Sequence, residues 1–132
     1  MLEDKIIIVT GGSGLLGREI VADIYKKGGK VINADISEKT DLQKGKIRID
    51  ITDGNSITSG CKLIVKEFGS IDGLVNNAYP RTKDWGTKFE DINPDSWRKN
   101  VDMQMNSSFL FCQTVLKQMK IQRSGSIVNI AS

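Results

Sequence analysis

The sequence contains no histidine, and it has only two cysteines and two prolines among its 132 residues. The absence of histidine excludes a Ser-His-Asp triad, a histidine general base and histidine-based metal sites. Cys61 and Cys112 are far apart in the sequence, and two isolated cysteines cannot form a structural zinc site. Because both lie in segments of apolar periodicity, we expect buried free thiols, a reducing cytoplasmic location and no bound metal.

Long apolar runs and runs of one charge are also missing. No apolar run reaches the roughly 20 residues that span a membrane, and the polar start, Met1–Lys5, does not resemble a signal peptide. The net charge is +3, and the basic residues do not cluster, which argues against nucleic acid as a partner. With 39% hydrophobic and 27% charged residues, the composition predicts one globular domain over residues 1–132, without a membrane partner.

The chain alternates between strand-like and helix-like apolar spacing. Strands are expected in five short segments: Lys5–Thr10, Lys30–Asp35, Lys46–Ile51, Ile71–Asn76 and Gly125–Ala131. Helices are expected in three longer segments: Gly14–Lys27, Asp53–Gly69 and about Asp95–Lys120. Strands alternating with helices indicate right-handed crossovers and a parallel sheet. The fold class predicted is α/β, a Rossmann-type doubly wound parallel sheet in three α/β/α layers that stops after the fifth strand.

Each expected helix carries an apolar stripe that should face the sheet. In the first helix the stripe is Leu16, Ile20 and Ile24, and in the second it is Ile57, Cys61, Ile64 and Phe68. In the long third helix the stripe is Trp97, Val101, Met105, Phe109, Cys112, Leu116 and Met119. A sheet that stops at the fifth strand leaves an apolar edge uncovered, which points to a missing remainder and an aggregation-prone fragment.

A glycine-rich turn separates the first strand from the first helix. It consists of eight residues: Thr10, Gly11, Gly12, Ser13, Gly14, Leu15, Leu16 and Gly17. Gly12-x-Gly14-x-x-Gly17 is the dinucleotide-binding pattern, in which glycines permit a tight turn and let the backbone approach a pyrophosphate at the helix N-terminus. No Gly-Lys-Ser/Thr follows, so a Walker-type loop is excluded.

Asp35 ends the second strand, eighteen positions after Gly17 (35 − 17). This is the expected position of the carboxylate that accepts a hydrogen bond from the ribose 2′-hydroxyl of NAD. Ile36 and Ser37 follow instead of the Arg that commonly accommodates a 2′-phosphate. We therefore expect NAD as the cofactor and NADP as the weaker ligand.

Four motifs then occur in a fixed order along the chain. They are the Thr10–Gly17 turn, Asp50-Ile51 after the third strand, Asn76-Asn77-Ala78 after the fourth, and the segment Gly125–Ser132 at the fifth. In this order the chain resembles the short-chain dehydrogenase/reductase family over all its residues. The stretch from Asn76 to Arg81, in which Tyr79 replaces a usual glycine, also resembles a subgroup that modifies flagellin and nonulosonic-acid sugars.

The resemblance implies a function and a set of roles. It implies hydride transfer between NAD(P) and a carbonyl or alcohol of a small-molecule substrate, in a homo-oligomer. It implies that Asp50 and Ile51 contact the adenine, while Asn76, Asn77 and Ala78 line the adenosine ribose and support the sheet. Ile36 follows the ribose-binding Asp35 and is expected in the same pocket. Ser132 would be the catalytic serine that orients the substrate carbonyl.

Besides Tyr79 and the glycine spacing, two features depart from the family pattern. The helix-borne asparagine of the family has no clear match, because Asn100, Asp102, Gln104 and Asn106 all lie near its position, and we transfer the role to none of them. The proton-donating Tyr-x-x-x-Lys should follow the fifth strand. Tyr79–Lys83 matches that spacing, but it precedes the strand, and Pro80 argues against the required helix.

Three hypotheses follow from this pattern. The first is the N-terminal part of a short-chain oxidoreductase that is inactive without its Tyr-x-x-x-Lys segment, since a proton donor contributes about 10²–10⁴-fold. The second is a non-catalytic NAD-binding module. The third is a fragment of a sugar-nucleotide epimerase or dehydratase, because the spacing Gly11-x-x-Gly14-x-x-Gly17 occurs in those longer enzymes.

Overall fold

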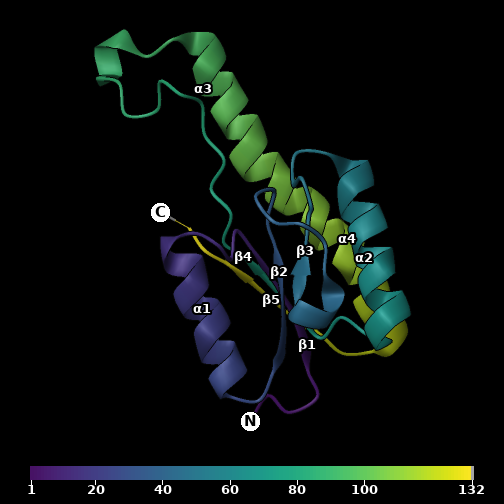
Figure 1. Ribbon diagram of the computed structural model, residues 1–132. Coiled ribbons are helices and arrows are strands. Elements are labelled where there is room, and N and C mark those ends of the chain that lie inside the picture. Colours follow the sequence, from purple (N-terminus) through teal and green to yellow (C-terminus); the bar gives the residue numbers. More distant parts are fainter. Residues whose placement is uncertain (132) are drawn as a thin grey trace.

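Five parallel strands form the centre of the computed structural model, which describes residues 1–131 (Figure 1). The strands are β1 (Ile6–Thr10), β2 (Lys30–Ala34), β3 (Lys46–Ile47), β4 (Gly73–Asn76) and β5 (Ser126–Asn129). Their order in the sheet is β3-β2-β1-β4-β5, and every neighbouring pair is parallel. This order confirms the predicted Rossmann-type α/β fold.

Helices cover both faces of the sheet. Helix α1 (Leu15–Lys26) lies on one face, while α2 (Gly54–Phe68) and α4 (Ser107–Gln122) lie on the other (Figure 1). Helix α4 continues α3 (Pro94–Val101) through a five-residue π-helical segment, η3 (Asp102–Asn106). Two short 3₁₀ turns complete the elements, η1 (Leu42–Lys44) and η2 (Phe89–Asp91).

The core follows from the alternation of side chains along β1. All five β1 residues are buried, as expected for a central strand covered on both faces. Ile6 and Ile8 point toward the α2 and α4 side, where they join the larger hydrophobic cluster. Ile7 and Val9 point the other way and pack with Ile24 of α1. A continuous β-branched run therefore supplies both layers of the core.

The predicted ends of α2 are confirmed. Asp53 accepts a hydrogen bond at 2.9 Å from the backbone N–H of Asn55, so it caps the helix. Gly69 ends the helix with φ of 86°, a conformation that glycine adopts without strain. The predicted stripe of α2 is also confirmed at Ile57, Cys61 and Ile64, which are all buried.

The predicted stripe of the long helix is wrong for most of its residues. Met119 is buried and Cys112 is half-buried, whereas the others are exposed: Trp97, Val101, Met105, Phe109 and Leu116. The face that packs on the sheet and α2 carries Phe111 and Val115 with Met119. The helix is apolar on two faces, so its periodicity fits two stripes, and packing against the sheet selects the second. In α1, Leu16 is likewise exposed, because it lies in the first turn as the helix leaves the glycine turn.

The third strand is shorter than predicted. Ladder pairing stops at Ile47, although Ile49 is still buried at 1% exposure. Beyond Ile47 the backbone N–H of Arg48 donates to the Thr40 hydroxyl at 3.0 Å, and that of Asp50 donates to the Ser56 hydroxyl at 3.0 Å. Side chains therefore replace the neighbouring strand as hydrogen-bond partners, since β2 has already ended at Ala34.

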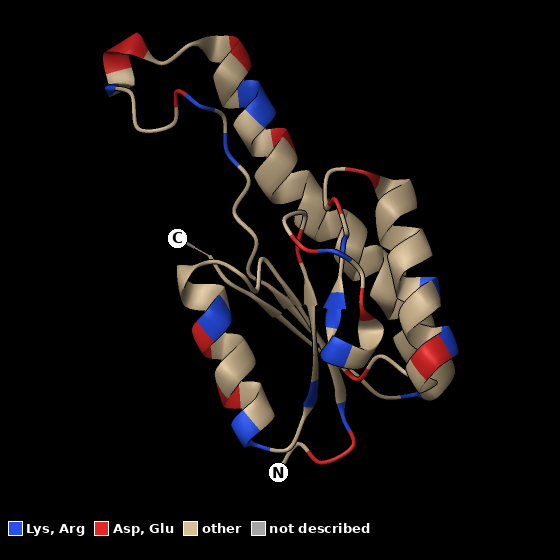
Figure 2. Ribbon diagram, in the orientation of Figure 1, with Lys and Arg blue, Asp and Glu red and all other residues tan. Residues whose placement is uncertain are grey.

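Charged residues of both signs are interspersed over the surface. Helix α1 carries residues of both signs, with basic residues toward its two ends and acidic residues between them (Figure 2). Among residues 1–131, no helix has both the length and the apolar character that crossing a membrane requires. In the same range, His, Cys, Asp and Glu side chains do not gather in threes as metal ligands would.

Candidate dinucleotide site

The carboxyl ends of the parallel strands meet at one edge of the sheet. The glycine turn follows β1, Asp35 follows β2, and Asn77 and Ala78 follow β4. Strand order reverses between β1 and β4, because the chain proceeds outward through β2 and β3 before it crosses back to β4. Ligands of open α/β sheets bind at such a switch point. The structure thus brings two of the four predicted motifs, together with Asp35, to one edge.

The Thr10 hydroxyl joins the two loops at this edge. Thr10 is 1% exposed, and its Oγ1 accepts hydrogen bonds from the backbone N–H groups of Asn77 and Ala78, each at 3.0 Å. The Asn77 side-chain amide in turn donates to the carbonyl oxygens of Thr10 and Gly11, both at 3.1 Å. The first and third motifs are therefore one hydrogen-bonded unit.

Two glycines of the turn leave no room for a side chain. A Cβ added at Gly17 would lie 2.1 Å from the carbonyl oxygen of Gly11, and one added at Gly12 would lie 2.4 Å from Asn33 Oδ1. Real Cβ atoms do not approach other atoms so closely. The backbone of the turn is packed against α1 and β2 as the dinucleotide-binding pattern requires.

The start of α1 is open to a ligand. Its N-cap residue is Gly14, which has no side chain to bond the first backbone N–H groups of the helix. Leu15 and Leu16 are exposed at this end. Unsatisfied N–H groups and the positive end of the helix dipole make such a terminus suited to a phosphate group.

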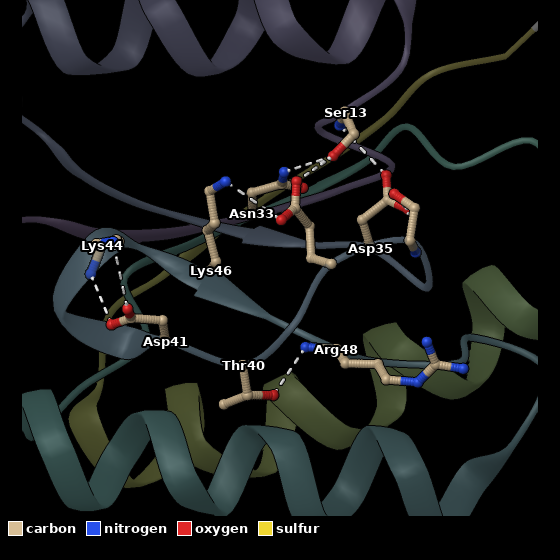
Figure 3. Close-up of polar contacts among 10 residues, drawn as sticks. Ser13, Asn33, Asp35, Thr40, Asp41, Lys44, Lys46 and Arg48 are labelled. Carbon is tan, nitrogen blue, oxygen red and sulfur yellow. Dashed lines mark hydrogen bonds and ion pairs between the residues drawn. The ribbon is translucent and has the colours of Figure 1, made fainter.

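Asp35 contacts the glycine turn directly. Its Oδ2 accepts a hydrogen bond from the Ser13 N–H at 3.2 Å, and its Oδ1 accepts from the N–H and hydroxyl of Ser37 at 3.0 and 2.8 Å. Burial raises the pKa of Asp35, but the hydrogen bonds from Ser37 and Ser13 more than offset this and hold the pKa below its usual range. The carboxylate is therefore charged at neutral pH and points toward the turn (Figure 3).

Asn76, Asp50 and Ile51 have more local surroundings. The Asn76 amide donates to Asn129 Oδ1 at 2.8 Å and to Cys112 Sγ at 3.2 Å, so it joins β4 to β5 and α4. Asp50 Oδ1 accepts from the N–H and hydroxyl of Thr52 at 2.9 and 2.6 Å. Ile51 beside it is half-buried and packs against the main core cluster. Asp50 thus shapes the turn that leads into α2.

The sequence did not indicate a polar relay next to Asp35. Asn33 Nδ2 donates to Ser13 Oγ at 2.9 Å, and Ser13 Oγ donates to Glu38 Oε1 at 2.8 Å. Lys46 Nζ lies 3.3 Å from Glu38 Oε2. A buried asparagine within a β-branched strand is a signal that could have directed attention to Asn33, whereas Glu38 and Lys46 carry no motif.

Ser132 lies outside the described residues. Of the residues that match Tyr-x-x-x-Lys, Tyr79 is 44% exposed and stacks edge-to-face on Trp85 at 5.6 Å. No helix spans Tyr79–Lys83, so the two side chains do not share a helical face, in agreement with their rejection as a catalytic pair.

The four residues around the family's helix-borne asparagine differ in their contacts. Gln104 lies in the π segment, and its amide donates to the Pro80 carbonyl at 3.1 Å. Asn100 is buried, and its side chain bonds both the Thr82 backbone and the Thr82 hydroxyl. Asn106 donates to Asp102 within the helix. The contacts of Gln104 and Asn100 hold the loop after β4 against the long helix.

Comparison with known proteins agrees with this geometry. Residues 5–132 match the family described as short chain dehydrogenase. The flagellin modification protein A of Campylobacter coli is 31% identical over 145 residues, which cover 100% of this chain and 57% of that protein. A 7alpha-hydroxysteroid dehydrogenase of Bacteroides fragilis is 32% identical over 141 residues, which cover 98% of this chain and 54% of that protein.

A solved structure shares the fold. The ligand-free aldohexose dehydrogenase of Thermoplasma acidophilum superimposes with a TM-score of 0.86 at 33% identity, covering 99% of this chain and 50% of that one. The chain therefore spans about half the length of the proteins that it matches. The names of these three proteins concern flagellin modification, a hydroxysteroid and an aldohexose, so similarity at this level does not define a substrate.

Proposed function

Because the chain belongs to the short-chain dehydrogenase/reductase family, we propose that it is the dinucleotide-binding part of an oxidoreductase that uses NAD. The observation that carries the proposal is the contact between Asp35 and the glycine turn. It places a charged carboxylate beside the open N-terminus of α1. A carboxylate there accepts a hydrogen bond from a ribose 2′-hydroxyl and repels a 2′-phosphate.

The residues present fit a dinucleotide. The glycine turn is a cradle that a Cβ at Gly12 or Gly17 would fill. Backbone N–H groups at the start of α1 would hold the pyrophosphate, and Asp35 would hold the adenosine ribose. As the family resemblance implies, we assign Asp50 and Ile51 to the adenine side and the Asn76–Ala78 turn to the ribose. We assign Ile36 to the pocket of Asp35.

When bound, the nicotinamide cofactor supplies the hydride chemistry, and the protein supplies binding and orientation. Thr10 and Asn77 keep the β1 and β4 loops together, which keeps the floor of the site rigid. We assign the orientation of a substrate carbonyl to Ser132. The exposed apolar residues Phe109 and Leu116 on α4 suit the homo-oligomer that the family resemblance implies.

Titration calorimetry of the full-length protein with NAD and NADP tests the proposal. NAD should bind more tightly than NADP, and Asp35→Ala should weaken NAD and remove the preference. Asp23→Ala is the matched control, because Asp23 is an exposed carboxylate near the opposite end of α1 that pairs with Lys27. Failure to bind NAD would overturn the proposal, as would NADP binding that equals NAD binding in the wild-type protein.

A further inference from the structure

A second carboxylate reaches the same serine as Asp35. The Ser13 N–H donates to Asp35 Oδ2 at 3.2 Å, and the Ser13 hydroxyl donates to Glu38 Oε1 at 2.8 Å. Glu38 comes from the loop after β2, and its side chain is only 20% exposed. Two negative charges therefore converge on one residue of the glycine turn.

The hydrogen bonds around Ser13 fix the direction of this arrangement. Asn33 is 8% exposed, and its amide donates to Ser13 Oγ at 2.9 Å (Figure 3). Ser13 Oγ uses its own hydrogen toward Glu38, because an ionised carboxylate can only accept a hydrogen bond. Asn33 Oδ1 is buried without a hydrogen-bond partner among the described residues and faces Gly12. The buried amide thus orients the serine so that it holds Glu38 over the turn.

A lysine partly neutralises the second carboxylate. Lys46 Nζ lies 3.3 Å from Glu38 Oε2, and its side chain is 46% exposed. Asp35, Glu38 and Lys46 together carry a charge of −1. Two further cations lie nearby. Lys44 pairs with Asp41 at 4.0 Å (Figure 3). Arg48 donates to the Ile36 carbonyl and keeps its positive charge, which is the same in every variant at positions 38 and 46.

We propose that Glu38 is a second specificity-determining residue against a 2′-phosphorylated dinucleotide, and that Lys46 is the cation whose charge it cancels. This inference rests on the proposed function, since it concerns the ribose end of the same site. Asp35 selects the 2′-hydroxyl by a hydrogen bond, whereas Glu38 acts by charge and by holding Ser13. Without Glu38, Lys46 would be available to attract a 2′-phosphate.

The size of the effect follows from Coulomb's law. Both carboxylates bond atoms of one serine, so they lie within the screening length of about 10 Å at 0.1 M salt. We take a distance of about 10 Å between the 2′-phosphate, of charge about −2, and the Glu38 carboxylate. In a partly solvated site, their repulsion then changes a dissociation constant about three- to tenfold. Removal of Glu38 should therefore lower the ratio of the NADP to the NAD dissociation constant about three- to tenfold.

Charge variants in the full-length protein test the proposal, with the two dissociation constants measured by calorimetry. The summed charge of positions 35, 38 and 46 is 0 in Glu38→Gln and −2 in Lys46→Met. In the double variant it is −1, as in the wild type. The ratio of NADP to NAD dissociation constants should be lowest in Glu38→Gln and highest in Lys46→Met. The double variant should return near the wild-type ratio. Glu67→Gln is the control, because Glu67 is an α2 carboxylate that accepts from Gln43 away from the turn.

The outcomes separate this inference from the proposed function. If the wild-type protein binds NAD and Glu38→Gln leaves the ratio unchanged, the inference is wrong and the proposed function stands. A gain for NADP that persists in the double variant would show that Lys46 is not the cation, which also contradicts the inference. If the wild-type protein binds neither cofactor, the proposed function fails and the inference fails with it.

Discussion

Replacement of Thr10 by valine tests the joint between the two loops of the site. Valine keeps the shape and the strand preference of threonine but removes the hydroxyl that accepts from Asn77 and Ala78. If the hydroxyl were idle, the extra buried methyl group would stabilise the protein by about 1 kcal/mol, since each buried CH₂ contributes about 0.8 kcal/mol. The sign of the change in the free energy of unfolding is therefore informative.

The structure predicts the opposite sign. An unsatisfied buried donor costs about 1–3 kcal/mol, and Thr10→Val leaves two part-buried N–H groups without their acceptor. The lower half of that range suits part-buried groups, which gives a cost of about 2–4 kcal/mol for the pair. After the gain from the methyl group, the free energy of unfolding should fall by about 1–3 kcal/mol.

Denaturant unfolding measures the free energy, and amide hydrogen exchange reports on the two donors. Thr10→Val should accelerate exchange at Asn77 and Ala78, because both N–H groups lose their acceptor. Thr10→Ser is the matched control: it keeps the hydroxyl, so it should keep the protection and lose only about 1 kcal/mol for the missing methyl group. A Thr10→Val protein that is as stable as the wild type, with unchanged exchange at both amides, would refute the reasoning.

Gly17→Ala should cost about 1–3 kcal/mol and abolish NAD binding, because its Cβ would lie 2.1 Å from a backbone oxygen; Gly54→Ala, with nothing within 4 Å, should leave the thermal melt unchanged or raise it. For Asp35, burial raises the pKa, but the Ser37 and Ser13 hydrogen bonds lower it by more, so the folded-state pKa is depressed. Its stabilising effect is therefore present above the unfolded-state pKa of about 3.9 and is lost as pH falls through the lower folded pKa. Asp35→Asn should therefore show a shallower loss of stability below about pH 4 in an acid titration, and equal slopes would contradict this. Burial raises the pKa of the Cys61 thiol to about 12, so a thiol reagent should label Cys112 first and Cys61 only after unfolding. Mass spectrometry measures the two labelling rates, and equal rates would contradict the burial of Cys61.

Local patterns predicted the scaffold because strands and turns depend on near neighbours. The β-branched run of β1 lies where its composition indicated, and the glycine pattern lies between a strand and a helix as its mechanism requires. Asp53 and Gly69 bound α2 as expected. Asp35 contacts the turn because β1 and β2 are parallel neighbours whose carboxyl ends share an edge.

Contacts between distant residues were beyond the reach of such patterns. The α4 face that packs on the sheet could not be chosen from periodicity, because Phe109 and Leu116 form as good a stripe as Phe111 and Val115. The Ser13–Glu38 bond joins residues 25 positions apart, and its formation depends on how the loop after β2 folds back. The spacing of residues along the sequence does not predict a hydrogen bond of that kind.

In the π segment of the long helix, the number of residues sets the rotation of α3 relative to α4. A π turn holds one residue more than an α-helical turn, and each residue of an α-helix corresponds to a rotation of about 100°. Deletion of one residue within Asp102–Asn106 would leave α4 seated on the sheet and turn α3 about its axis by roughly that angle. Asn100 and Gln104 hold the loop after β4 to this helix, so the loop would be displaced as well. Related proteins that differ by a single residue here would thus present different surfaces beside the same dinucleotide cradle.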